Sequence, residues 1–199
     1  MSQPVTLRQL SGLPTEPARL ADSALIIVDA QNTYRSGVMA LEGVEPALDE
    51  CARLLARARA VGAPVIHIQH DSGPGSPYDI RAEIGAIADK VAPQGDEPVV
   101  IKGYPNSFVG TDLEARLRAL GVKHLVIVGF MAHMCINSTS RGAFNLGFQV
   151  CVPASTVATR ALPGPEGELI PAAQVKAVAL AALGDLFALV VPGIDGIPD

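Results

Sequence analysis

The sequence lacks any apolar run long enough to cross a membrane, because Gly, Pro or a charged residue interrupts each hydrophobic stretch. Its start, MSQPVTLRQLSG, also lacks the basic and then apolar pattern of a signal peptide. Basic residues are not in excess, since 15 Lys and Arg stand against 20 Asp and Glu. A broad basic surface for nucleic acid or anionic membranes is therefore not expected, although the composition does not exclude a local basic patch. These absences predict a cytoplasmic protein that acts on a small neutral or mixed-charge molecule, with no nucleic acid and no membrane as partner.

Cysteine is also scarce, and its spacing argues against several kinds of site. Cys51, Cys135 and Cys151 are an odd number without paired spacing, which disfavours a disulfide framework and a zinc knuckle. No C-x-x-C occurs, so a dithiol redox protein is disfavoured too, although the sequence leaves open whether Cys151 lies near another cysteine. Neither G-x-x-x-x-G-K-[ST] nor a strand-linked G-x-G-x-x-G is found. We therefore expect no nucleotide and no other cofactor.

What the sequence does contain is an alternation of apolar strand patterns and helical patterns. Its 199 residues and 49% hydrophobic content predict a single domain, residues 1–199, with a core over about 24–191. Buried strands are expected over residues 24–29, 64–69, 98–101, 124–129, 148–152 and 187–191. Helices are expected over residues 44–61, 112–120, 135–146 and 171–183. This alternation predicts a Rossmann-like, three-layer α/β/α fold around a mainly parallel six-stranded sheet.

Two segments do not fit the alternation. Residues 71–97 form the longest irregular stretch, with only a short helix expected around 80–89, and we interpret it as a lid or an oligomer contact. The Pro- and Gly-rich segment 162–171 is typical of an exposed connection. We expect a homo-oligomer, a dimer or a tetramer, in which a neighbouring subunit could complete a pocket formed by the first segment.

Three reactive side chains follow three of the predicted strands. Asp29 ends the first strand, Lys102 follows the third, and Cys135 follows the fourth at the expected start of a helix. In open α/β sheets, ligands bind outside the carboxyl ends of the strands. Taken singly, the three could be a strand-end cap, a solvated charge and a small buried residue. Their convergence on one edge of the sheet indicates a catalytic site instead.

The chemistry of these groups suggests a role for each. A helix N-terminus and an ammonium group both favour a thiolate, so we expect Cys135 to be a nucleophile whose thiol pKa is lowered by Lys102. Asp29 would be its base, and its own negative charge would make the lowering moderate. Cys51 and Cys151 lie in apolar helix and strand patterns, which indicates core positions.

The segments around these residues resemble the isochorismatase-like cysteine hydrolases, a family that includes nicotinamidases and other small-amide hydrolases. The match spans roughly residues 24–191, and its main pieces are Ile27-Val28-Asp29-Ala30-Gln31, Ile101-Lys102-Gly103-Tyr104-Pro105-Asn106-Ser107-Phe108 and Val128-Gly129-Phe130-Met131-Ala132-His133-Met134-Cys135. The resemblance implies a triad of Asp29, Lys102 and Cys135 on a sheet of order 3-2-1-4-5-6. It also implies a cis peptide at Phe130–Met131, which would aim the N–H groups of Met131 and Cys135 at a developing oxyanion.

The matching loops and the strand ends also supply candidates for the substrate pocket. Six side chains are candidates: Gln31, Tyr34, His70, Tyr104, Phe108 and His133. For His133 two interpretations stay open, a pocket position or a hydrogen bond to loop backbone. Nicotinamidases hold a metal with an Asp-x-His pair and a further His, whereas this chain has His67-Ile68-Gln69-His70-Asp71, which lacks that spacing. We therefore expect no metal.

Together these features predict a cysteine hydrolase that cleaves the carbon–nitrogen bond of a small amide or lactam-like substrate through a thioester. Two alternatives stay open. Isochorismatases proper cleave a vinyl ether and do not need the cysteine, and a binding protein could keep the fold without turnover. The presence of Cys135 with an intact triad favours the amide hydrolase, and the sequence does not identify its substrate.

Overall fold

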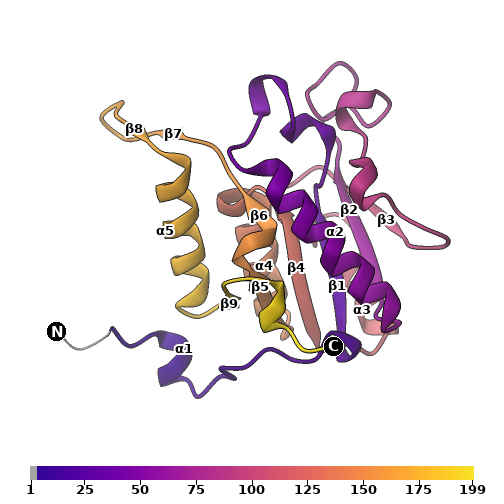
Figure 1. Cartoon of the computed structure of the whole chain (residues 1–199), viewed down its shortest axis with the longest axis vertical. Helices are drawn as coiled ribbons and strands as arrows, with labels where there is room; N and C mark the ends of the chain where they lie inside the picture. Colours follow the sequence, from indigo (N-terminus) through magenta and orange to yellow (C-terminus); the bar gives the residue numbers. More distant parts are fainter. Residues whose placement is uncertain (1–3) are drawn as a thin grey trace.

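The predicted strands lie in one sheet in the computed structural model, which describes residues 4–199 (Figure 1). The sheet has seven strands in the order β3-β2-β1-β4-β5-β9, with β6 paired to the end of β4, and every pairing is parallel. The strands are β1 Ser23–Val28, β2 Val65–His70, β3 Val99–Lys102, β4 His124–Phe130, β5 Gln149–Pro153, β6 Val157–Ala158 and β9 Leu189–Val191. The expected order 3-2-1-4-5-6 is confirmed, with β9 as its sixth strand and the two-residue β6 as an addition.

Helices cover both faces of the sheet because the strands present apolar side chains alternately to either side. Leu25 and Ile27 of β1 join the cluster beneath α2, which crosses in front of the sheet in Figure 1. Ile26 and Val28 join the opposite cluster, with side chains of α3, α4 and α5. The helices are α1 Leu7–Leu10, α2 Val44–Ala60, α3 Leu113–Ala119, α4 Asn137–Asn145 and α5 Ala172–Gly184. Burial of a large apolar side chain contributes roughly 1.5–3 kcal/mol, so β1 is held firmly on both faces.

Two expected features of the chain differ in the structure. The helix predicted around residues 80–89 is replaced by two short 3-10 turns, Glu83–Gly85 and Asp89–Val91. The backbone between them is extended because Gln31 and Ile87 form an antiparallel bridge there. The connection 162–171 contains a small hairpin, β7 Leu162–Pro163 and β8 Leu169–Ile170, which projects beyond α5 in Figure 1.

The first three residues, part of the segment without a signal-peptide pattern, lie outside the described residues. Over residues 4–199, no helix is long and apolar enough to cross a membrane.

The neighbouring strands β1 and β4 approach each other closely where the strand order reverses. Val28 pairs with Gly129, and a Cβ on Gly129 would lie 2.0 Å from the Val28 carbonyl oxygen. Gly129 has φ of 110°, a conformation that side chains rarely adopt. Only glycine therefore fits there, and Asp29, the residue that follows β1, lies beside the turn that follows β4.

Candidate active site

The structure brings Asp29, Lys102 and Cys135 together at the carboxyl edge of the sheet. The Lys102 ammonium nitrogen lies 2.7 Å from Oδ2 of Asp29 and 3.4 Å from Sγ of Cys135. All three residues are buried, with 0% of Asp29, 2% of Lys102 and 4% of Cys135 exposed. Asp29 directly follows β1 and has φ of 48°, in the left-handed region that non-glycine residues seldom occupy. Such conformations occur preferentially at functional sites, where the surroundings hold them in place.

Cys135 lies in a π-helical turn, Ala132–Ile136, between β4 and α4, rather than in the first turn of a long helix over residues 135–146. Such turns are rare and occur often at functional sites. The peptide bond between Phe130 and Met131 is cis, as the family resemblance implies. Met131 is 5% exposed and lies against the same cavity as Cys135.

The expected lowering of the Cys135 thiol pKa is wrong. Burial, and after it the charge of Asp29, raise this pKa to about 12, and the opposing effect of the Lys102 ammonium is smaller. Burial likewise raises the pKa of the Asp29 carboxyl, and the Lys102 ammonium opposes that rise. The resting site therefore holds a neutral thiol, and its proton must be removed by a base when a substrate is bound. Sequence spacing could not indicate this, because the depth of burial depends on the whole fold.

A cavity of about 260 Å³ opens beside the Cys135 sulfur. Its lining residues are Tyr34, His70, Tyr78, Pro105, Met131, Met134 and Cys135. Two of the six predicted pocket residues, Tyr34 and His70, are among them. Three further lining residues were not among the predicted candidates: Tyr78, in the irregular segment 71–97, and Pro105 and Met134, within the matching motifs. The predominantly apolar and aromatic lining suits a small, uncharged group.

Gln31 does not line this cavity, because backbone groups occupy its whole amide. Its Nε2 donates to the carbonyl oxygens of His70 at 3.0 Å and Gly85 at 2.8 Å, and its Oε1 accepts from the His70 N–H at 2.9 Å. Gln31 thus ties the end of β2 to the segment that follows. Its candidate role in substrate contact is replaced by a structural one.

Tyr104 and Phe108 also lie outside the cavity. Tyr104 is 61% exposed, and Phe108 stacks on Phe148 with ring centroids 6.2 Å apart. The intervening Ser107 is fully buried, and its hydroxyl shares a 2.9 Å hydrogen bond with the Thr139 hydroxyl of α4. This anchor orients the loop so that Pro105, rather than either aromatic ring, reaches the cavity.

His133 neither lines the cavity nor bonds the loop backbone through its ring; it forms a hydrogen bond with another side chain. Its Nδ1 lies 2.5 Å from the Thr159 hydroxyl, just after β6. Burial and the nearby Arg160 guanidinium lower the pKa of His133, so its ring is neutral at pH 7. The contact with Thr159 is therefore neither the pocket position nor the hydrogen bond to loop backbone that the sequence left open.

The histidines of β2 do not converge on a common ligand. His67 is buried and its Nε2 lies 2.9 Å from Glu97, whereas His70 borders the cavity. Residues three apart on a strand face opposite sides of the sheet. Within residues 4–199, no group of three or more His, Cys, Asp or Glu side chains is arranged to hold a metal ion. The side chains present therefore do not fit the metal site of nicotinamidases.

The other two cysteines are core residues, as predicted. Cys51 is fully buried in α2 and donates to the Thr156 carbonyl oxygen at 3.3 Å, and Cys151 in β5 is 7% exposed. Burial raises the thiol pKa of both. All three cysteines are free, and Cys151 pairs with Val126 near the start of β4, away from the end that leads to Cys135. This arrangement provides no resolving partner for a redox dithiol.

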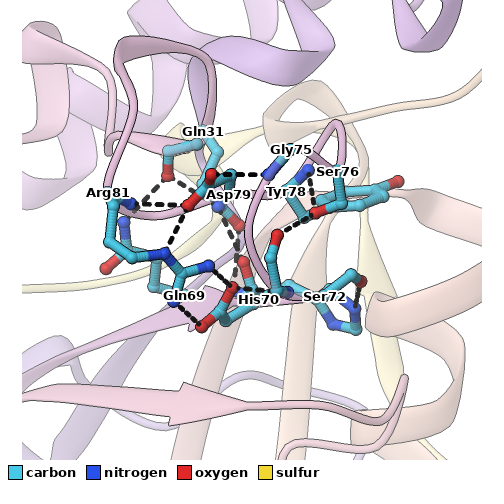
Figure 2. Close-up of polar contacts among 12 residues, drawn as sticks. Gln31, Gln69, His70, Ser72, Gly75, Ser76, Tyr78, Asp79 and Arg81 are labelled. Atoms are coloured by element: carbon cyan, nitrogen blue, oxygen red, sulfur yellow. Dashed lines mark hydrogen bonds and ion pairs between the residues drawn. The ribbon is translucent and has the colours of Figure 1, made fainter.

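A polar network fixes the segment that carries Tyr78 over the cavity (Figure 2). Arg81 forms ion pairs with Asp79 at 2.6 Å and Asp71 at 2.9 Å. Asp79 also accepts the Gly75 N–H at 2.8 Å. The segment is therefore an ordered wall of the site, with the Tyr78 ring 4.9 Å from the ring of His70.

Comparison with known proteins identifies relatives over most of the chain. The sequence model of the isochorismatase domain matches residues 23–181. A secreted isochorismatase effector of Verticillium dahliae is 35% identical over 191 residues, which cover 96% of this chain and 98% of the relative. A ureidoacrylate amidohydrolase of Stutzerimonas stutzeri is 31% identical, over 68% of this chain and 71% of the relative. The crystal structure of an isochorismatase from Pseudomonas putida superimposes with a TM-score of 0.92 at 37% identity, covering 96% and 97% of the two chains.

Proposed function

This chain belongs to the isochorismatase family and is a hydrolase, and from that premise we propose that it cleaves the carbon–nitrogen bond of a small amide through a thioester on Cys135. One observation carries the proposal. The Cys135 sulfur borders a 260 Å³ cavity and lies 3.4 Å from an ammonium that is itself paired with a buried carboxylate. A nucleophile, a proton acceptor and a fixed positive charge thus meet where a small molecule can enter.

In the first half of the reaction, Cys135 attacks the amide carbonyl carbon while its thiol proton passes to Asp29. Asp29 suits this step because burial raises its pKa, which strengthens it as a base, while Lys102 keeps it ionised. The developing oxyanion would rest on the backbone N–H groups of Met131 and Cys135. Collapse of this intermediate breaks the carbon–nitrogen bond, and the departing nitrogen takes the proton from Asp29.

In the second half, water cleaves the thioester. Asp29 takes a proton from the water, whose oxygen attacks the thioester carbon, and the proton then returns to the Cys135 sulfur as the carboxylic acid leaves. The net reaction is amide and water to carboxylic acid and amine, with the enzyme restored. Lys102, 3.4 Å from the Cys135 sulfur, would stabilise the sulfur anion whenever it forms.

The vinyl ether cleavage of isochorismatases is the second candidate, because the relative from Verticillium dahliae is named an isochorismatase. That reaction does not need a thiol, whereas Cys135 here is paired with the Lys102 ammonium at the wall of the cavity. We propose the amide reaction on this ground. The two differ in whether a Cys135→Ala variant retains turnover.

The test is a screen of small neutral amides, including nicotinamide, with ammonia release as the readout and intact-mass spectrometry of the quenched enzyme. We expect release of ammonia from at least one amide and an acyl adduct on Cys135. The Cys135→Ala variant is the control and should give neither. Reversible binding without adduct or product would reject the amide hydrolase, and turnover by the alanine variant would reject the covalent route.

We also propose that the protein acts as a homo-oligomer in the cytoplasm, on a small molecule and without nucleic acid or membrane. The edge strand β3 supports self-association, because Val99 and Ile101 are 38% and 43% exposed on it. Light scattering of the purified protein should give a dimer or tetramer mass. A monomer mass at micromolar concentration would contradict this part of the proposal.

A further inference from the structure

The Lys102 ammonium has a third neighbour besides Asp29 and Cys135. Its nitrogen lies 3.2 Å from Nδ1 of His70, the residue that pairs with Lys102 across β2 and β3. Because β2 lies between β3 and β1, the lysine side chain must pass the end of β2 to reach Asp29. His70 therefore stands beside the path of this side chain, at the last position of β2.

The geometry determines which nitrogen of His70 carries the proton. An ammonium group donates only, so Nδ1 must accept from Lys102 and is unprotonated. The other nitrogen, Nε2, lies 3.0 Å from the Ser72 hydroxyl and donates to it, as Figure 2 shows for this pair. Gln31 holds the His70 backbone on both its N–H and its carbonyl oxygen. The His70 ring is therefore held in three ways: by the hydrogen bonds to the His70 backbone, by the Nε2 hydrogen bond to Ser72, and by packing against the Tyr78 ring.

The charges around His70 keep its ring neutral. Burial and the adjacent Lys102 ammonium lower its pKa, more than the carboxylates of Asp29 and Asp71 raise it. Asp71 is in turn neutralised by two hydrogen bonds from Arg81. The remaining groups that face the ring, the Tyr78 phenol and the Cys135 thiol, are uncharged because burial raises the pKa of each.

We propose that His70 is a positioning residue, whose Nδ1 accepts a hydrogen bond from the Lys102 ammonium and so fixes the lysine between Asp29 and Cys135. Asp29, Cys135 and His70 lie 2.7, 3.4 and 3.2 Å from the nitrogen, one neighbour for each proton of the ammonium group, and the Lys102 side chain is 0% exposed. Without the His70 acceptor, the ammonium has one free proton in a buried site and shifts away from the sulfur. The proposal rests on the proposed function only in taking Cys135 as the reactive thiol.

The test measures alkylation of Cys135 by iodoacetamide at pH 8.5, with peptide mapping to follow each cysteine separately. His70→Leu should slow the reaction of Cys135 about tenfold, which corresponds to one unit of thiol pKa. His70→Gln should restore most of the rate, because its Oε1 can accept from Lys102. His124→Leu, at the opposite end of the sheet, is the matched control and should react like the wild type.

A double-mutant cycle with Lys102→Met separates positioning from a general structural effect. If His70 acts through Lys102, His70→Leu should slow alkylation in the wild-type background and have no further effect in Lys102→Met. Equal slowing in both backgrounds, a wild-type rate for His70→Leu, or a folded His70→Gln as slow as His70→Leu would each overturn the proposal. Thermal unfolding of every variant verifies that it is folded.

Should His70→Leu fail to fold, Ser72→Ala takes its place, because Ser72 is exposed and its loss removes only the hydrogen bond to Nε2. It should slow alkylation in the wild-type background and not in Lys102→Met, and no slowing in either would overturn the proposal. Alkylation requires no amide substrate. A positive cycle with a negative amide screen would therefore reject the proposed function and leave the role of His70 standing, and the reverse result would do the opposite.

Discussion

The Lys102 ammonium and the Asp29 carboxylate form a 2.7 Å ion pair from which solvent is entirely excluded. Buried charges are costly unless each has a partner, so removal of either residue leaves the other uncompensated. The pair allows a carboxylate whose pKa is raised by burial to remain ionised next to a neutral thiol. In the resting site, therefore, an ionised base and a neutral thiol lie beside the cavity, and no thiolate is preformed.

Replacement of Cys135 by alanine should abolish turnover and leave the fold intact. The loss in kcat should be on the order of a thousandfold or more, as for other covalent nucleophiles. Steady-state kinetics on an amide found in the screen measures this, and thermal unfolding checks the fold. A variant with near-normal rate would refute the cysteine mechanism.

Activity should fall at acidic pH because Asp29 must be ionised to accept the thiol proton. Burial raises its pKa, so the carboxylate becomes protonated, and activity is lost, at a higher pH than for an exposed aspartate. Asp29→Asn should lose most of its activity at every pH and no longer show this acid limb. A pH–rate profile of both proteins tests the assignment, and an unchanged limb in the variant would remove Asp29 from the role of base.

Chelation should leave the activity unchanged, because the side chains of β2 do not fit the metal site of nicotinamidases. The measurement is the rate after incubation with EDTA and dialysis, compared with an untreated sample. Loss of activity and its recovery with a divalent ion would contradict this prediction. His67, His70 and Asp71 would then be the first candidates for ligands.

Iodoacetamide at pH 6.5 should label Cys135 before Cys51 and Cys151. All three thiols have a raised pKa, so access decides the order rather than a preformed thiolate. Cys135 borders the 260 Å³ cavity and has a base beside it, whereas Cys51 is fully buried in α2 and Cys151, although 7% exposed, borders a space of only about 20 Å³. Labelling should be slow, accelerate as the pH rises, and inactivate in proportion. Equal labelling of the three cysteines would contradict the assignment of the cavity.

Glu97 should stabilise the fold in a pH-dependent way. The Arg59 guanidinium, with further hydrogen bonds from Gln94 and His67, lowers the pKa of Glu97 from 4.5 to about 2. A lowered carboxyl pKa adds stability above pH 4.5 that is lost as the pH falls toward 2. Glu97→Gln should therefore lower the free energy of unfolding at pH 7 by roughly 1–3 kcal/mol, and by much less near pH 2.

Urea denaturation at several pH values measures this difference. The control is Glu114→Gln, which removes an exposed ion pair with Arg118 and should change stability by less than about 0.5 kcal/mol. A loss for Glu97→Gln that is the same at pH 7 and pH 2 would exclude the electrostatic explanation.

The family resemblance implied the strand order, and the sequence predicted the meeting of Asp29, Lys102 and Cys135, because parallel strands bring their carboxyl ends to one edge and the matching motifs identify the residues there. It also identified Cys51 and Cys151 as core residues from their apolar periodicity. Apart from the strand order, these predictions depend on local patterns and on the order of elements along the chain. Both are properties that a sequence carries directly.

Only the tertiary structure decided what surrounds the reactive groups. Gln31, a predicted pocket residue, instead bonds the backbone at the end of β2 and at Gly85 through its side-chain amide. Tyr78 reaches the cavity because the ion pairs of Arg81 with Asp71 and Asp79 hold its segment there. The Cys135 thiol has a raised pKa because burial outweighs the nearby ammonium. Direction of side chains, burial and competing charges arise from contacts between residues far apart in the chain, so the order of residues alone does not determine them.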